Sequence, residues 1–342
     1  MKLPPPSSVA FLSLLAACGG SPQAPAQTGP GVGGNGAGEM APSEDTSIAV
    51  VFAPQVIVGS NFGCWLKADK SVTCWGELAD DAPAGTFVQT SAASFHACGT
   101  TTDGEAKCWG AQSKAPSGKF AQVAAGDHAN CGVRPDGELV CWGSKGKTEY
   151  PAALLEKCGS TEEHKECEDF SWLGMRLVTK RPQGKFRRVT VGGRHACALT
   201  LTGEAQCWAP AEDDQDEAGA REVDDISLPP GNYRQIAAGF MHTCAVDTSG
   251  KLICAGGVEG QSEPGAGATS ASQVATGVLN SCAVLADQSV ACWGSGDHKA
   301  TQVPSGKFVS VAAGLHLGCA LPPEGPPVCW GDRESSAAMP RK

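Results

Sequence analysis

The chain has 342 residues, a formal net charge of −10 and seventeen cysteines. Phosphate binding needs clustered Lys and Arg, so the acidic balance argues against a nucleic-acid partner. So many cysteines do not suit a reducing cytosol unless they bind metal, and 41% of hydrophobic residues is enough for a packed core.

The first eighteen residues have the features of an export signal. A lysine at position 2 precedes the apolar run 9–17, which is too short to cross a bilayer as a helix. The run ends in "LAAC", which resembles the bacterial lipoprotein signal, in which small residues precede a lipidated cysteine. The resemblance implies a signal peptide over 1–17, lipidation of Cys18 and a place outside the cytoplasm, at the outer membrane or cell surface, with membrane contact through the lipid anchor only. An ordinary cleaved secretory signal is the alternative.

Residues 18–45 hold almost only Gly, Pro and small or polar residues. Such a stretch cannot bury enough apolar surface to order itself, which predicts a disordered tether. Its reach would be on the order of 30 Å, and its role would be to hold the folded part away from a membrane.

A sequence motif with two cysteines ten residues apart then occurs seven times. A β-branched residue stands eight before the first cysteine in all seven units, a glycine five before it in six, and a tryptophan follows the second cysteine in six. Tandem units with a period in the thirties indicate a repeat architecture. The first cysteines of the units are Cys64, Cys98, Cys131, Cys197, Cys244, Cys282 and Cys319.

The spacing within each motif predicts a β-hairpin with a disulfide across it. Five units have a glycine six residues after the first cysteine, where a tight turn needs positive φ. The two cysteines then oppose each other at about 4.5–5.5 Å between Cα atoms, within disulfide range. Side-chain alternation buries the cysteine face against the next unit and puts the tryptophan on the opposite face. The expected pairs are Cys64–Cys74, Cys98–Cys108, Cys131–Cys141, Cys197–Cys207, Cys244–Cys254, Cys282–Cys292 and Cys319–Cys329.

Small β units with radial packing indicate a propeller. The pattern Phe-x-x-Val-x-x-Gly-x-x-His-x-Cys, followed by x-Gly-x-x-x-Cys-Trp-Gly, resembles the repeats of the regulator of chromosome condensation family; "FVSVAAG" at 308–314 and "CWG" at 329–331 show it well. The resemblance implies an all-β fold, a seven-bladed β-propeller of short disulfide-stapled repeats, over residues 46–342. We further expect a strand at 46–52 to pair with the last blade. The family includes nucleotide exchange factors for small GTPases and a secreted inhibitor of β-lactamases, so its motifs are specific for fold and poor for function.

Two insertions, 144–181 and 209–229, interrupt the period and should lie as neighbours on one face. The first holds an expected extra disulfide, Cys158–Cys167, and three candidate partner-binding residues, Trp172, Leu173 and Met175. The alternative is that its apolar residues pack onto blade edges. The second carries an acidic run at 211–225, for which a solvated loop is favoured over a Ca²⁺ site.

Five histidines stand two or three residues before a first cysteine: His96, His128, His195, His242 and His316. They could form a ring of metal ligands or acid–base groups, but we expect them to belong to the fold motif, hydrogen-bonded to backbone near the glycine turn. The chain has no Cys-x-x-Cys, phosphate loop or nucleophile elbow, so no metal, cofactor or enzymatic activity is predicted.

The predicted function is therefore a monomeric, lipid-anchored binding scaffold for a protein or glycan partner. The alternatives are an extracytoplasmic lyase or hydrolase with its site at the channel mouth and, by family analogy, a guanine-nucleotide exchange factor.

Overall fold

The computed structural model describes residues 53–111, 114–143, 177–178, 180–209, 226–257, 260–265, 268–295 and 300–331. All belong to the second of two units into which the chain divides, Thr46–Lys342. The expected signal peptide, Cys18, the tether and the strand at 46–52 lie outside the described residues. So do Cys158, Cys167, Trp172, Leu173, Met175 and the acidic run at 211–225. Among the described residues, no helix is long and apolar enough to cross a membrane.

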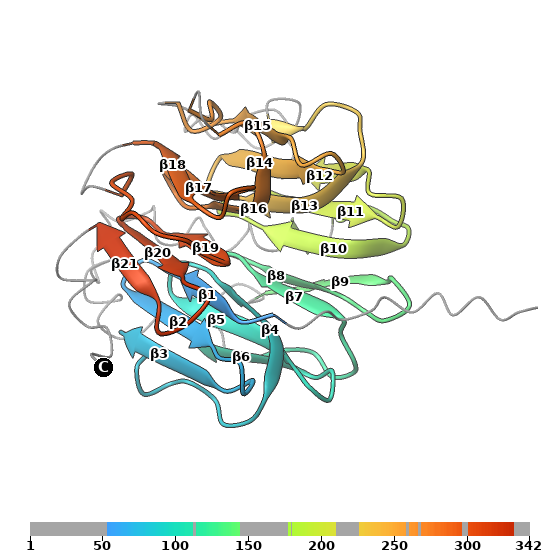
Figure 1. Ribbon diagram of the computed structural model, residues 1–342. Helices are drawn as coiled ribbons and strands as arrows, with labels where there is room; N and C mark the ends of the chain where they lie inside the picture. Colours follow the sequence, from blue (N-terminus) through green and yellow to red (C-terminus); the bar gives the residue numbers. More distant parts are fainter. Residues whose placement is uncertain are drawn as a thin grey trace, which may run out of the picture. The chain divides into compact units, whose positions relative to one another are not determined.

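Seven three-stranded antiparallel sheets make up the described fold, and each consists of three consecutive strands (Figure 1). The all-β expectation with seven blades is confirmed. The strands of blades 1 to 4 are β1 (Gln55–Val58), β2 (Phe62–Leu66), β3 (Val72–Gly76), β4 (Phe87–Ala92), β5 (His96–Thr101), β6 (Ala106–Gly110), β7 (Gln122–Ala125), β8 (Asn130–Val133), β9 (Leu139–Trp142), β10 (Phe186–Val191), β11 (Ala196–Thr200) and β12 (Ala205–Trp208). Those of blades 5 to 7 are β13 (Tyr233–Ala238), β14 (His242–Asp247), β15 (Leu252–Gly256), β16 (Ala271–Thr276), β17 (Asn280–Leu285), β18 (Val290–Gly294), β19 (Ser310–Ala313), β20 (Leu317–Leu321) and β21 (Val328–Gly331).

The second and third strands of every blade form the predicted hairpin. Its turn has positive φ in all seven blades, including the two without glycine there, where Lys70 and Gln288 have φ of 68° and 69°. The paired cysteines face each other in the strand register and form the seven expected disulfides. Their Cα atoms are 4.0–4.1 Å apart, somewhat closer than expected, because the cysteines occupy non-hydrogen-bonded pairs, the nearer of the two kinds.

The apolar core lies between blades rather than within them. The cluster between blades 3 and 4 is representative: Cys131 and Val133 on one blade pack against Phe186, Val189 and Trp208 on the next. The cysteine face of each blade thus meets the face of its successor that carries the β-branched residue and the tryptophan, as the alternation predicted. Each blade therefore buries its apolar residues against its two neighbours, as units of a repeat protein do.

The last blade packs against the first in the same way, which closes the ring (Figure 1). Leu317 and Leu321 of blade 7 share a cluster with Val56, Val58 and Trp75 of blade 1. Every sheet is made within one contiguous stretch, so among the described residues side-chain packing, rather than a shared strand, joins the two ends.

Glycines let the backbones approach where the first strand of each blade turns into the second. A Cβ atom on Gly239 would lie 2.6 Å from the carbonyl oxygen of Gly277 in the next blade, and one on Gly314 would lie 2.5 Å from that of Gly59 across the ring closure. These separations are shorter than any Cβ contact that a protein accommodates without a shift. Close packing between blades therefore favours the glycine five residues before the cysteine in six blades, whereas blade 2 has Ala93 there.

Candidate functional site

A pocket opens at the end of the ring where the first and second strands of all blades connect. It is lined by one three-residue segment from each of the seven blades, from 58–60 in blade 1 to 313–315 in blade 7. Its empty volume is about 410 Å³, part of which is open to solvent.

The third residue of each segment gives the pocket most of its chemical variety, because the second is glycine or alanine and the first is alanine, valine or threonine. Unlike the glycine that precedes it in most blades and the β-branched residue four positions earlier, this residue varies around the ring. In order from blade 1 to blade 7 it is Ser60, Ser94, Asp127, Gly193, Phe240, Val278 and Leu315.

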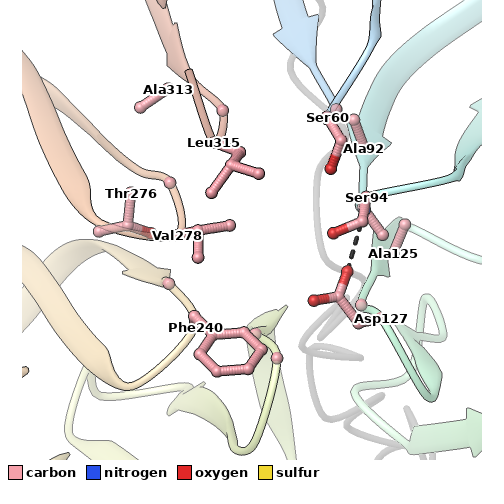
Figure 2. Close-up of a pocket in the computed structure, with 18 of the residues that line it drawn as sticks. Ser60, Ala92, Ser94, Ala125, Asp127, Phe240, Thr276, Val278, Ala313 and Leu315 are labelled. Carbon is pink, nitrogen blue, oxygen red and sulfur yellow. Dashed lines mark hydrogen bonds between the residues drawn. The ribbon is translucent and has the colours of Figure 1, made fainter. Parts of the chain in front are cut away.

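The pocket is therefore divided into a polar and an apolar half (Figure 2). Ser60, Ser94 and Asp127 face it from blades 1 to 3, and the backbone N–H of Ser94 donates to Oδ1 of Asp127 at 2.9 Å. Phe240 and Leu315 lie on the opposite side, from blades 5 and 7. Such a site can hold a ligand that has hydrogen-bonding groups on one edge and an apolar surface on the other.

Two charges of opposite sign stand at the rim beside His128. The guanidinium of Arg194 lies 5.7 Å from the ring centre of Phe240, and the backbone N–H of Arg194 donates to the carbonyl of Phe240 at 3.2 Å. Burial lowers the pKa of His128; Asp127 opposes that shift and Arg194 adds to it. His128 is therefore neutral near pH 7 between a carboxylate and a guanidinium.

Below the pocket, glutamine side chains join the first strands of neighbouring blades. Nε2 of Gln89 donates to the carbonyl of Val123 in the next blade at 2.9 Å, and Oε1 accepts from its N–H at 3.1 Å. The amide thus satisfies both backbone groups on the exposed edge of the neighbouring strand. We call this set of residues, nine before the first cysteine of their blade, the glutamine belt: Gln55, Gln89, Gln122, Gln235 and Gln273.

Two blades depart from the belt. In blade 7 the position is Ser310, whose hydroxyl accepts from the N–H of Val56 at 3.5 Å across the ring closure. In blade 4 it is Arg188. Sequence reasoning missed the belt, although an alignment of the seven units at this position shows glutamine five times.

The histidines at position two before a cysteine lie between blades and away from the pocket. Nε2 of His96 is 2.7 Å from Oδ1 of Asn130, that of His195 is 2.8 Å from Oγ1 of Thr243, and that of His242 is 2.8 Å from Oγ of Ser281. Each partner belongs to the next blade and directly precedes its first cysteine. The expectation of backbone partners was therefore wrong: the polar side chains facing these histidines are neutral acceptors supplied by the neighbouring repeat.

The hydrogen bonds assign the tautomer of these imidazoles. The hydroxyl of Ser281 donates to the carbonyl of Gln261 at 3.4 Å, so it accepts from Nε2–H of His242. Nδ1 of His195 and of His242 is buried without a partner, which suits an unprotonated nitrogen. Burial lowers the pKa of His195 to about 3, with a further contribution from His242, and that of His242 to about 4. All three histidines are neutral, and none is placed to act as an acid or base in the pocket.

Only the end of the first insertion falls within the described residues. Leu177 is fully buried in the cluster between blades 3 and 4, and its carbonyl accepts from Nε1 of Trp208 at 3.0 Å. For this residue the alternative of packing onto a blade edge holds. Within the described part of the chain, no three His, Cys, Asp or Glu side chains converge as metal ligands.

Residues 120–146, which contain blade 3, match the sequence model of the regulator of chromosome condensation (RCC1) repeat. The resemblance of the repeats to this family is thus confirmed in the blade with the most regular motif. No curated protein sequence matches the chain.

Several solved structures share the fold. The ectodomain of the Physcomitrella patens receptor kinase CR4 is 23% identical over 82% of this chain and 73% of its own, with a TM-score of 0.59. The CRINKLY WD40 ectodomain of the Arabidopsis thaliana receptor kinase ACR4 is 22% identical over 84% and 98%, with a TM-score of 0.60. Yeast RCC1 (Prp20), bound to Kap60, is 17% identical over 76% and 77%, with a TM-score of 0.51. At these identities the likeness is one of fold alone.

Proposed function

We propose that the chain is an extracytoplasmic binding scaffold that captures a protein or glycan partner at the face carrying the pocket, and that it is held at a membrane through Cys18. Binding, rather than catalysis, is the role. The observation that carries the proposal is the variation around the pocket. The residue four before the first cysteine takes six different identities in seven blades, whereas the β-branched position and the glycine next to it repeat almost without exception.

A position whose residue changes from blade to blade is not constrained by the fold, and the residue after it, which includes His128 and Arg194 at the rim, varies as much. Here the variable position is also the one that faces the pocket, and its residues divide into a polar and an apolar half. Loops and turns on a rigid scaffold commonly carry recognition residues. The arrangement is therefore suited to a partner that presents both a polar and an apolar group.

Two features support a place outside the cytoplasm. Seven disulfides are typical of chains that mature in an oxidising compartment. Two of the proteins that share the fold are receptor ectodomains. The lipoprotein-like "LAAC" at 15–18 would then supply the anchor.

The alternative of a lyase or hydrolase depended on acid–base residues clustered at the channel mouth. His96, His195 and His242 are instead buried between blades, at 2% exposure or less. Nucleotide exchange on a GTPase would rest on analogy of fold alone. The enzyme alternative keeps one observation, the neutral His128 beside Asp127 and Arg194 at the pocket rim, and nucleotide exchange gains none.

Site-specific photo-crosslinking on intact cells tests the proposal. A photoreactive residue replacing Val278, in the pocket, should give a discrete covalent adduct. The same residue replacing Leu201 should give none, because Leu201 is 48% exposed on the hairpin turn at the opposite end of β11. Equal adducts from both positions, or none from position 278, would overturn the proposal.

Matched substitutions refine the result. Asp127→Asn and Phe240→Ala should each reduce the adduct severalfold, whereas Asp136→Asn, on the exposed turn between β8 and β9, should leave it unchanged. Replacing Trp172, Leu173 and Met175 together by alanine tests whether the first insertion contributes to capture.

A further inference from the structure

Arg188 interrupts the glutamine belt at the junction of blades 4 and 5. A glutamine here would both donate and accept, as Gln235 does with Val274 one blade later, at 3.0 and 2.9 Å. A guanidinium has donors only. The junction between blades 4 and 5 therefore lacks the acceptor that the belt supplies elsewhere.

The neighbouring strand presents a backbone N–H at this position. In the pairing of β13 with β14, Gly239 N–H donates to the carbonyl of His242 at 2.8 Å, and hydrogen-bonded pairs alternate with non-bonded ones from there. Ala238 and Ile236 therefore turn their N–H and C=O groups away from β14. The N–H of Ala238 reaches Oγ1 of Thr190 in blade 4 at 3.0 Å, whereas no side chain among the described residues accepts from Ile236.

The surroundings of Arg188 are positive. Its side chain is exposed to solvent and, within the described residues, makes no hydrogen bond or ion pair. The adjacent Arg187 is engaged, because its Nη2 donates to the carbonyl of Tyr233 at 2.6 Å. Desolvation by the surrounding blades, although part of the side chain stays in contact with solvent, and the charge of Arg187 lower the pKa of Arg188, and no carboxylate of the described residues offsets that shift. A guanidinium remains protonated under these conditions.

We infer that Arg188 and the N–H of Ile236 form an anchor for a carboxylate that enters the channel. Arg188 and Ile236 hold the positions that a glutamine and its backbone partner hold at the glutamine-bearing junctions, where an amide oxygen accepts from the N–H. A carboxylate is planar, matches the fork of a guanidinium, and has a second oxygen to take the place of the missing Oε1. The site lies below the pocket, two to three residues before Val191 and Ala238 of the same strands, and none of its groups lines the pocket, so it does not depend on the proposed function.

Sodium acetate is the probe, at constant ionic strength, with acetamide as the neutral control. The readout is the ¹⁵N–¹H shift of the Ile236 amide, and the Val274 amide, occupied by Gln235, serves as internal reference. We expect acetate to shift Ile236 in a saturable way and to leave Val274 in place, and acetamide to have no effect. Glucuronate and an aspartyl dipeptide, titrated in the same way, distinguish a sugar acid from an acidic peptide as the source of the carboxylate.

The decisive variant is Arg188→Gln, which restores the belt and should fold with an undiminished unfolding midpoint. It should weaken acetate binding at least tenfold. Arg234→Gln removes the same charge one blade later, where Nη2 already donates to the carbonyl of Ala271, and should bind acetate as the parent does. The inference is wrong if Ile236 does not respond in the parent protein, if Arg188→Gln binds equally well, or if Arg234→Gln loses binding to the same extent.

Discussion

Acid should destabilise the ring through the histidines buried between its blades. A histidine whose pKa is lower in the folded than in the unfolded chain binds fewer protons when folded. Its contribution to stability is complete above the unfolded pKa and is lost as the pH falls towards the folded one. Both histidines have a pKa of about 6.5 in the unfolded chain. In the folded protein the pKa is about 3 for His195 and about 4 for His242, so stability is lost as the pH falls between these limits.

The size of the effect follows from these values. At pH 5 each unfolded imidazole is almost fully protonated, whereas each folded one is almost fully neutral. The linkage relation then gives a loss of about 2 kcal/mol per histidine between pH 7.5 and pH 5, or about 4 kcal/mol for the pair. Because the pKa of His96 and of His128 is also lowered by burial, their contributions have the same sign.

Urea unfolding at pH 7.5 and pH 5, with the disulfides intact, measures this loss. The matched variant is His195→Asn/His242→Asn, since blade 6 already has an asparagine, Asn280, at the equivalent position. The loss of unfolding free energy between pH 7.5 and pH 5 should be smaller in this variant by about 4 kcal/mol. His96 and His128 are present in both proteins, so their contributions cancel in the comparison. The same pH dependence in the parent and the variant would refute this account of the buried histidines.

Three further changes test the packing of the ring. Gly314→Ala places a Cβ against a backbone carbonyl of blade 1 and should lower the free energy of unfolding by about 1–3 kcal/mol in urea titration; an unchanged midpoint would show that the ring closure can widen. Gln235→Leu leaves the N–H and C=O of Val274 without partners and should cost about 1–3 kcal/mol, with faster hydrogen exchange at that amide; unchanged exchange would mean that the belt does not protect the strand edge. Replacing the Cys98–Cys108 pair with alanines should cost about 2–3 kcal/mol, and a melting temperature equal to that of the parent would contradict a stabilising role for the disulfide.

The repeat and its hairpins could be predicted because their determinants lie within one unit. The ten-residue cysteine spacing, the turn glycine and the alternation of side chains are local, and they led to the correct pairs and the correct faces. Even Lys70 and Gln288, which replace the glycine, adopt the same positive φ, since the disulfide and the strand register constrain the turn.

The contacts that could not be predicted are those between neighbouring blades. His96 needs Asn130 one blade later, and Gln89 needs the backbone of Val123 there; neither relation is visible within a single unit. The pocket was missed for the same reason, because its residues are related by the ring and by no sequence spacing shorter than a full repeat. The roles of Trp172, Leu173 and Met175 as partner-binding residues remain predictions.

Because each sheet and each disulfide of the described residues is completed within its own contiguous stretch, the first and last blades have no special place in the ring. A circular permutant opened in any exposed connection, for instance the one after β3, would encode the same sheets and the same sulfur pairs. In the export that we propose, every hairpin could oxidise as soon as its own residues emerge, before the next one has been translocated. Maturation would then require little isomerase activity, since the partner of each thiol is the nearest one along the chain.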